Sequence, residues 1–307
     1  MPELPEVERV RLTLSPIIGR RITRVSIRRS DVIHLSTNGE NKKSNRQLAC
    51  LLLSGATIKS IQRHGKQLAI NTVENPKQKS SDNASGCFCV HLGMTGALTH
   101  QLASTRQANG KTIKPVGETQ RPTLAAHTHV IWKLDDGSRL LFRDPRRFGG
   151  IWPFSSFADL ARTRWGKLGP DATKIKPVKL HQRLTSTGRA LKAVLLDQHV
   201  IAGLGNIYVD ELLFKSNLHP ETPANTLSET KVHHLVVNMR QILKAAIQAG
   251  GSSVRDYVDG LGKTGGFQNQ HQVYGRGGKP CNGCNTELLR LVVAGRSTVF
   301  CPKCQRG

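Results

Sequence analysis

Apolar residues follow two different patterns along the chain, one in each half. Over residues 5–18 they recur every three or four positions, which predicts a helix with Pro5 and Glu6 in its first turn. From residue 22 to residue 154 they gather instead in short β-branched runs typical of strands. The predicted strands are residues 22–27, 48–53, 67–73, 87–92, 130–134 and 139–142.

These strands are joined by turns and polar stretches. Asp135-Asp136-Gly137-Ser138 separates the last two runs and is a hairpin signal. Three polar stretches rich in Asn, Lys, Ser and Gly are predicted to be surface loops: residues 36–46, 75–86 and 104–122. Many short strands with intervening turns predict a β-sandwich.

The second half changes to helical spacing. Helices are predicted at residues 181–198, 206–216 and 227–249, the last with a capping box of Thr226 and Glu229. The overall class is therefore α+β. The expected division is a β-sandwich at 1–160, a linker at 161–176, a helical domain at 177–262 and a C-terminal segment at 263–307.

The charge of the chain indicates the class of partner. Lys and Arg number 45 against 21 Asp and Glu, which gives a formal net charge of +24. Such an excess favours a polyanion, with nucleic acid the commonest and an anionic membrane surface the rival. No apolar run approaches the roughly 18 residues that span a bilayer, and residues 1–8 lack the features of a signal peptide. We therefore expect a soluble, unsecreted protein without membrane contact.

Four of the seven cysteines form two identical pairs. Their spacing, Cys281-x2-Cys284-x16-Cys301-x2-Cys304, is typical of tetrahedral zinc and leaves no open position for a substrate. We predict one structural Zn²⁺ there. The other three, in apolar strand-like segments, are expected to be buried thiols: Cys50, Cys87 and Cys89.

The segment between the cysteine pairs predicts a small hairpin. Residues 288–293 and 297–300 read as two short strands, with Gly295 and Arg296 between them. Arg296 would then lie at the tip of the finger, where a guanidinium meets phosphate well.

The first residues allow an unusual nucleophile. Removal of Met1 would leave Pro2 as a free secondary amine, and an α-amino group with a pKa near ~8 is partly neutral at pH 7. Attack on C1′ of a nucleoside gives a charged iminium that acidifies the C2′ proton and promotes loss of the 3′ phosphate. Glu3 would protonate O4′ or the departing base. On the residues alone, Pro2 and Glu3 are more often just an extended start followed by a helix cap.

Seven motifs in order carry a resemblance to a known family. They are PELPEVE at position 2, HGK at 64, HLGMTG at 91, DPRRFG at 144, GLGNIY at 203, QVYGR at 272 and the four-cysteine finger. The chain thus resembles the bacterial formamidopyrimidine-DNA glycosylases over nearly its whole length. Leu4, where the sister endonuclease VIII group usually has Gly, favours the branch that acts on purine lesions.

The resemblance implies a bifunctional DNA glycosylase and abasic-site lyase, with roles for the motif residues. Pro2 resembles the Schiff-base nucleophile and Glu3 the general acid, while Glu6 organises the helix start. Lys66 matches the family lysine of β-elimination and phosphate contact. Arg296 matches the finger arginine associated with δ-elimination.

The resemblance also implies residues that hold damaged duplex DNA. An enzyme that acts on a base must extrude it and fill the gap. Met94 and Phe148 match the side chains that wedge into the stack, and Arg146 matches the one that bonds the orphaned cytosine. Without the resemblance, Met94 and Phe148 read as core residues.

Further DNA contacts are expected around a helix-two-turn-helix motif that contains GLGN. Asn206 is expected to cap the following helix and to bind phosphate there. His127 matches a phosphate-contacting histidine, although the usual His-Asp-His is His-Thr-His here. Arg189 and Lys192 are expected either to meet the DNA backbone or to lie on a solvated face.

The glycine-rich residues 250–278 resemble the loop that closes over an extruded purine, with a departure from the usual run at 264–270. The expected function is excision of 8-oxoguanine and formamidopyrimidines followed by β,δ-elimination. The alternatives are an oxidised-pyrimidine glycosylase and a non-catalytic zinc-ribbon DNA-binding protein. We expect a monomer without a small-molecule cofactor, active in the bacterial cytoplasm at the nucleoid.

Overall fold

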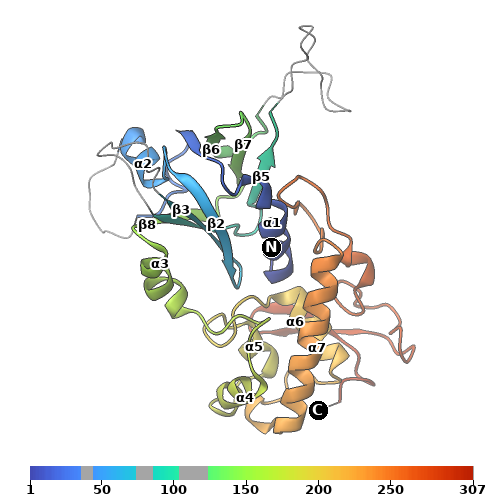
Figure 1. Ribbon diagram of the computed structural model, residues 1–307. Helices are drawn as coiled ribbons and strands as arrows, with labels where there is room; N and C mark the ends of the chain where they lie inside the picture. Colours follow the sequence, from blue (N-terminus) through green and yellow to red (C-terminus); the bar gives the residue numbers. More distant parts are fainter. Residues whose placement is uncertain (36–43, 74–85, 104–123, 307) are drawn as a thin grey trace.

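The computed structural model describes the chain except residues 36–43, 74–85, 104–123 and 307. All three polar stretches predicted as loops lie largely outside the described residues. The sandwich and the helical part with its finger lie at opposite ends, and the N-terminus lies between them (Figure 1).

Two four-stranded antiparallel sheets form the N-terminal half, which confirms the β-sandwich. One sheet has the order β1-β6-β7-β5: Ile22–Ile27, Thr128–Leu134, Arg139–Arg143 and Ala97–Gln101. The other has the order β2-β3-β4-β8: Thr57–His64, Gln67–Val73, Cys87–His91 and Gly150–Phe154. The predicted hairpin at 135–138 joins β6 to β7. Three strands, β2, β5 and β8, were not predicted, because none of them contains a run of β-branched apolar residues.

One predicted strand is wrong. Residues 48–53 lie mostly in a helix, α2 (Asn45–Leu51), and not in the sheet. Ser44 and Gln47 form a capping box at its start, and Leu48 and Leu52 pack into the core between the sheets. A local cap with two apolar residues four positions apart outweighs the β-like composition. Cys50 is consequently a half-buried helix residue, whereas Cys87 and Cys89 are buried in β4 as predicted.

The first helix is close to the prediction but shorter. α1 (Leu4–Thr13) is followed by a 3-10 turn, η1 (Ser15–Ile17), at Pro16. After the sandwich come α3 (Phe157–Thr163) and the 3-10 turn η2 (Trp165–Lys167), which lead into the helical part.

The helix predicted at 181–198 is two helices, α4 (Pro177–Thr185) and α5 (Leu191–Leu196). Between the two helices the backbone forms hydrogen bonds with another segment. The N–H of Leu191 donates to the carbonyl of Thr222, and the carbonyl of Arg189 accepts from the N–H of Ala224. This tertiary pairing replaces the helical bonds that the local sequence would allow.

Two further helices complete the helical part. α6 (Asn206–Lys215) matches its prediction. α7 (Glu229–Gln248) follows the 3-10 turn η3 (Ala224–Thr226) and has Ser228 as its cap, so the predicted Thr226 capping box is wrong. A last 3-10 turn, η4 (Phe267–Gln270), precedes the finger, whose strands are β9 (Leu289–Val293) and β10 (Arg296–Phe300). Among the described residues, none of the helices is long and apolar enough to cross a membrane.

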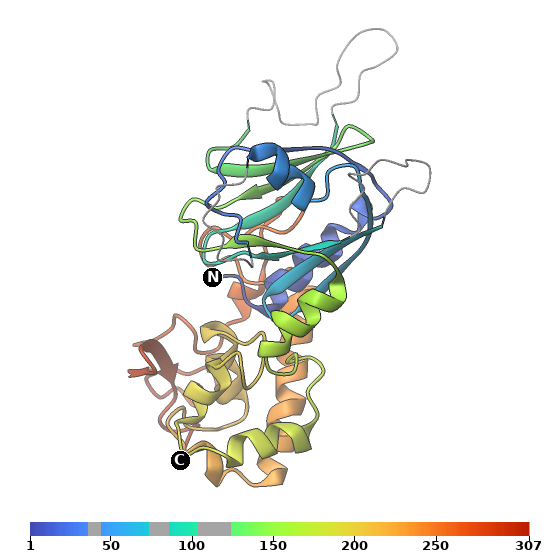
Figure 2. The ribbon, with the colours of Figure 1, turned by 90° about the vertical axis from the view of Figure 1, so that its left-hand side faces the viewer.

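Each half contributes one residue to the hydrophobic core of the other half. Leu4 of α1 is part of the helical core, and Tyr257 of the glycine-rich segment is part of the sandwich core. The finger has a small core of its own, and in Figure 2 it lies beside the junction with the N-terminus nearby. The candidate site residues come from both halves and meet at this junction.

Candidate active site

The N-terminal segment is fixed to the loop that contains GLGN. The N–H of Leu4 donates to the carbonyl of Gly203 at 3.0 Å, and a Cβ at Gly203 would lie 2.4 Å from Cδ1 of Leu4. Gly203 also has a φ of +116°, which favours glycine. A glycine is required here so that the start of α1 can lie against the start of α6.

Glu3 lies in an anion-binding position at the N-terminus of α6. Its carboxylate accepts hydrogen bonds from the N–H groups of Ile207 (3.0 Å) and Tyr208 (3.4 Å), and a Cβ at Gly205 would lie 2.4 Å from its Cδ. Burial raises the pKa of Glu3, while the charge of Lys66 and the two backbone donors oppose this rise. A buried carboxyl with a raised pKa is suited to hold a proton and release it as a general acid.

Glu6 lies beside Glu3 and is bound from three sides. It accepts hydrogen bonds from the N–H of Glu3 (2.8 Å), the hydroxyl of Tyr208 (2.5 Å) and the N–H of Ser252 (2.7 Å). Burial, followed by the charge of Glu3, raises the pKa of Glu6 to about 7. Tyr208 and Ser252 were missed by the sequence reasoning, although Tyr208 ends the GLGNIY motif.

Lys66 lies on the turn between β2 and β3 and is only 8% exposed. Burial lowers its pKa, and the charges of Glu3 and Glu6 oppose that effect. A lowered pKa makes it easier for this ammonium to release a proton, as a lysine that transfers protons requires.

A buried ion cluster holds the Lys66 turn in place. Arg63 pairs with Asp171 at 2.6 Å and with Glu8 at 2.7 Å, and the N–H of Gly65 donates to Asp171 at 2.9 Å. The cluster joins β2, α1 and the segment after η2. Sequence reasoning missed Arg63 and Asp171 because their partners lie far apart in the chain.

A cavity of about 400 Å³ opens in front of Pro2. Its walls come from the N-terminus, the sandwich turns, α6 and the glycine-rich segment: Met1, Pro2, Met94, Thr95, Arg146, Ile207, Ser252, Val254, Arg255, Asp256, Tyr257 and Tyr274. The α-amino group of Met1 has a lowered pKa because of burial. The structure thus brings the N-terminus together with Met94 and Arg146.

Two sandwich turns present the side chains expected to enter the DNA stack. Met94 is 39% exposed and Phe148 is 57% exposed, whereas most apolar side chains of the sandwich are buried. The guanidinium of Arg146 lies 4.6 Å from the ring centroid of Phe148. Thr95 donates to Asp144 at 2.6 Å and accepts from the N–H of Arg146, which fixes the two turns side by side. The reading of Met94 and Phe148 as core residues, made without the resemblance, is wrong.

Lys192 is the clearest error among the expected DNA contacts. Its side chain is 0% exposed, and its ammonium pairs with Asp210 at 2.5 Å and Thr298 at 2.7 Å. It joins α5, α6 and β10 inside the protein, so neither a phosphate contact nor a solvated face is available to it.

The other residues expected to contact DNA have different surroundings in the structure. Asn206 does not cap α6, because Gly205 is the cap and the Asn206 side chain donates to the carbonyl of Ser297 at 2.8 Å. Arg189 is exposed but pairs with Asp197 at 3.1 Å. His127 is exposed in a loop with a φ of +63°, and the buried His129 bonds the carbonyl of Asp144 instead. Arg296 begins β10, directly before Ser297, and is exposed.

The four finger cysteines lie together as a metal centre requires. One sulfur atom from each lies within 4.8 Å of the others: Cys281, Cys284, Cys301 and Cys304. Backbone N–H groups of Gly283 and Cys304 point at the sulfurs of Cys281 and Cys301 at 3.4 Å. Four converging thiolates with N–H donors fit a closed tetrahedral zinc site. Among the described residues this is the only such group of His, Cys, Asp and Glu side chains.

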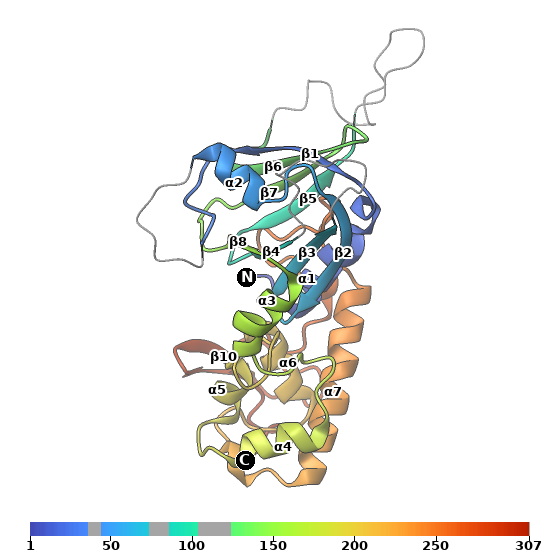
Figure 3. The same ribbon diagram turned by 60° about the vertical axis from the view of Figure 1, so that its left-hand side comes forward.

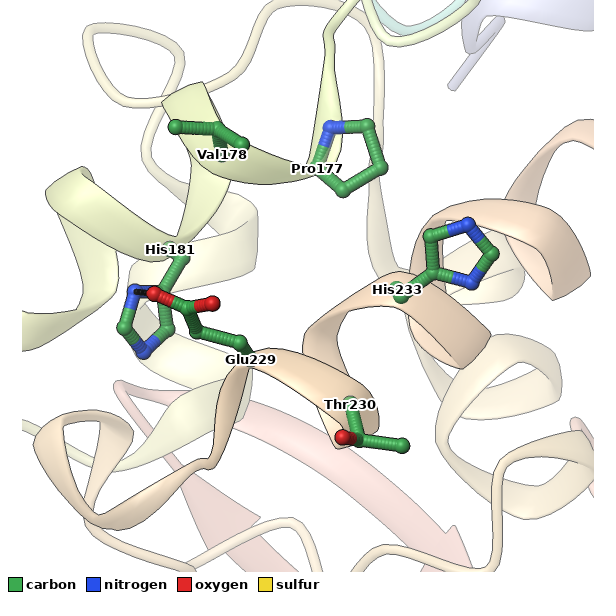
Figure 4. A pocket seen from close by; sticks show the side chains of 6 residues that line it. All are labelled: Pro177, Val178, His181, Glu229, Thr230 and His233. Atoms are coloured by element: carbon green, nitrogen blue, oxygen red, sulfur yellow. Dashed lines mark ion pairs between the residues drawn. The ribbon is translucent and has the colours of Figure 1, made fainter.

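A separate pocket of about 300 Å³ lies between the first turns of α4 and α7 (Figure 4). It is lined by Pro177, Val178, His181, Glu229, Thr230 and His233. Nε2 of His181 faces the carbonyl of Leu227 at 3.2 Å, and Nδ1 lies 3.8 Å from Glu229. His181 therefore links α4 to the start of α7, away from the cavity at Pro2.

Comparisons with known proteins cover the chain in three parts. Residues 1–151 match the formamidopyrimidine-DNA glycosylase N-terminal domain, residues 168–258 match its H2TH domain, and residues 278–307 match the zinc finger found in FPG and IleRS.

Curated and solved relatives extend over the whole length. The formamidopyrimidine-DNA glycosylase of Bacillus subtilis is 39% identical and that of Heliobacterium modesticaldum 38%, with 99% and 100% of both chains covered. A Lactococcus lactis FPG mutant in complex with a Fapy-dG containing DNA has a TM-score of 0.79 at 32% identity, covering 100% of both chains. The MutM (FPG) protein of Thermus thermophilus has a TM-score of 0.75 at 34% identity, covering 99% of this chain and 98% of its own.

Proposed function

The chain belongs to the formamidopyrimidine-DNA glycosylase family, and we propose that its reaction is carried out by the residues that meet around the Pro2 cavity. It is a base-excision repair glycosylase for oxidised purines, and its finger holds a structural zinc ion. The names of the relatives set aside both alternatives, an oxidised-pyrimidine glycosylase and a non-catalytic zinc-ribbon protein.

Pro2 is the proposed nucleophile once Met1 has been removed. Its secondary amine attacks C1′ of the damaged nucleotide, and the electrons of the glycosidic bond leave with the base. Glu3 supplies a proton to O4′ or to the departing base. Its burial at the N-terminus of α6 and its raised pKa support this role.

Lys66 and Arg296 act on the strand after the base has left. The iminium acidifies the C2′ proton, Lys66 takes part in its transfer, and the bond from C3′ to the 3′ phosphate breaks. The lowered pKa of Lys66 supports this assignment. Arg296 contacts phosphate during the second elimination, in which the 5′ phosphate leaves, and its exposure on the finger supports that role.

Damaged double-stranded DNA is the proposed ligand of the surface around this cavity. Met94 and Phe148 would fill the gap left by the extruded nucleotide, and Arg146 would bond the orphaned base; their exposure next to the cavity supports this proposal. We also propose phosphate contacts by Asn206 at the start of α6, by His127, which matches a family histidine, and by Arg189.

The remaining expectations concern the protein as a whole. We propose the four-part division at 1–160, 161–176, 177–262 and 263–307, with the glycine-rich residues as the loop over the extruded base. We also propose a monomer without a small-molecule cofactor that acts in the cytoplasm at the nucleoid, where its +24 charge would favour contact with DNA.

The observation that carries the proposal is that Glu3 and Lys66 are buried beside the N-terminus, close enough for their charges to shift its pKa, while the N-terminus itself lines the cavity. It is tested by excision assays on duplexes that contain 8-oxoguanine or thymine glycol. The chain should release 8-oxoguanine faster, and Glu3→Gln should lower that rate by about 10²-fold or more because the general acid is lost. Preference for thymine glycol would overturn the substrate, and full activity of Glu3→Gln would overturn the acid.

A further inference from the structure

The two sheets of the sandwich have very different outer faces. The outer face of the β2-β3-β4-β8 sheet is covered by α3, where Leu160 packs on Ala69, Cys87 and Cys89. The outer face of the β1-β6-β7-β5 sheet carries a row of three cations instead.

This outer-face row consists of Arg24, Lys133 and Arg139. Arg24 is directly opposite Lys133, and Lys133 is directly opposite Arg139, so the three lie side by side on adjacent strands. Their strand neighbours Val25, Trp132 and Leu140 belong to the core. Because successive side chains of a strand point to opposite faces, the row points away from the core.

Among the described residues, the three cations of the row are not paired with carboxylates. In the described part of the chain the structure records no ion pair for any of its three members, and the nearby Asp136 is paired with Arg20 at 3.1 Å. Like charges directly opposite each other on a sheet are destabilising. An anionic partner would turn this repulsion into attraction.

The position of the row separates it from the cleft at Pro2. The β1-β6-β7-β5 sheet forms the end of the sandwich that lies away from α4 and the helical part (Figure 3). A duplex held in the cleft therefore does not lie against this end of the sandwich. The distance across three strands is about 10 Å, along which duplex DNA carries about six negative charges.

We propose that the row of Arg24, Lys133 and Arg139 is a second, sequence-independent binding surface for a separate segment of double-stranded DNA. The enzyme would then hold one duplex in the cleft and touch another with the far side of the sandwich. Such a contact would let it pass between DNA segments without complete release.

The test is a bridging assay with two duplexes. A duplex with a tetrahydrofuran abasic analogue is fixed to beads and loaded with the full-length zinc-containing protein. Capture of a second, fluorescent, undamaged duplex is then measured at several salt concentrations. Capture should fall with a slope of about 2.7 log units per log unit of salt if each cation neutralises one phosphate.

Two triple variants distinguish the effect of the row itself from the effect of a change in net charge. The triple variant Arg24→Glu, Lys133→Glu, Arg139→Glu should capture about tenfold less fluorescent duplex, or less still. Its binding to the bead-bound duplex should remain normal. Lys179→Glu, Lys231→Glu, Lys244→Glu changes the charge equally at exposed positions of the helical part and should retain capture. Arg24→Gln, Lys133→Gln, Arg139→Gln removes the positive charges without adding negative ones and should also lower capture.

Three outcomes would overturn the proposal. They are absence of capture by the unaltered protein, equal capture by the row variants and the control variant, and row-dependent binding to anionic lipid vesicles without capture of DNA. Retention of the protein on the beads is measured separately, so a failure of the cleft to bind is distinguished from a failure of the row.

Discussion

Two buried lysines of this chain have opposite surroundings. Lys192 is enclosed between α5, α6 and β10, with a carboxylate, a hydroxyl and a backbone carbonyl as partners. Lys66 lies on a turn at the cleft and has nearby charges, Glu3 and Glu6, but no hydrogen bond of its ammonium is recorded among the described residues. A buried cation whose donors are satisfied holds elements together, whereas one whose donors remain available can act on a ligand.

The largest expected effect comes from Lys66→Ala. Cleavage of preformed abasic duplex should fall by about 10²- to 10⁴-fold, because proton transfer by a positioned side chain contributes that much. The free energy of unfolding should change little, since no bonded partner is lost. Lys59→Ala, at an exposed position of the same hairpin, is the matched control. If both variants cleave equally well, Lys66 is not part of the chemistry.

Lys192→Met should show the opposite pattern. Removing one member of a buried ion pair leaves Asp210 without its partner, which costs about 3–5 kcal/mol in the free energy of unfolding. The double variant Lys192→Met, Asp210→Asn should recover much of this loss, because no unpaired charge remains. Urea unfolding of the zinc-containing protein measures both. A single variant as stable as the parent would contradict the structural role.

Glu6 should give a smaller, pH-dependent effect. The pKa of Glu6 is raised to about 7 in the folded protein, so between its unfolded pKa and pH 7 the folded state binds the extra proton. The free energy of unfolding should therefore decline as pH rises through this window, by about 3 kcal/mol for this group. Glu6→Gln removes the decline, and unfolding curves at pH 5 and pH 7.5 measure it. Equal pH dependence in both proteins would contradict the raised pKa.

Local patterns were sufficient for part of the fold and for the metal centre. The β-branched runs of β1 and β3 and the cysteine spacing depend on neighbours in sequence, and they were predicted with the correct residues. The break between α4 and α5 could not be predicted, because the bonds that replace the helix come from the segment around Thr222.

The same limit applies to the candidate site. Motif residues such as Glu3 and Lys66 could be named from the sequence, but the ion cluster of Arg63 and Asp171 depends on residues 108 positions apart. Lys192 was misplaced for the same reason, since its partners on α6 and β10 become neighbours only in the fold.

The central claim is that the reaction begins at the amine of Pro2. Mature protein, with loss of Met1 verified by mass spectrometry, is incubated with abasic duplex and borohydride, and the adduct is mapped by peptide mass spectrometry. The account predicts a covalent adduct on Pro2 that is absent from a Pro2→Gly, Lys66→Ala double variant. The absence of an adduct with the mature protein, or undiminished trapping by the double variant, would contradict it.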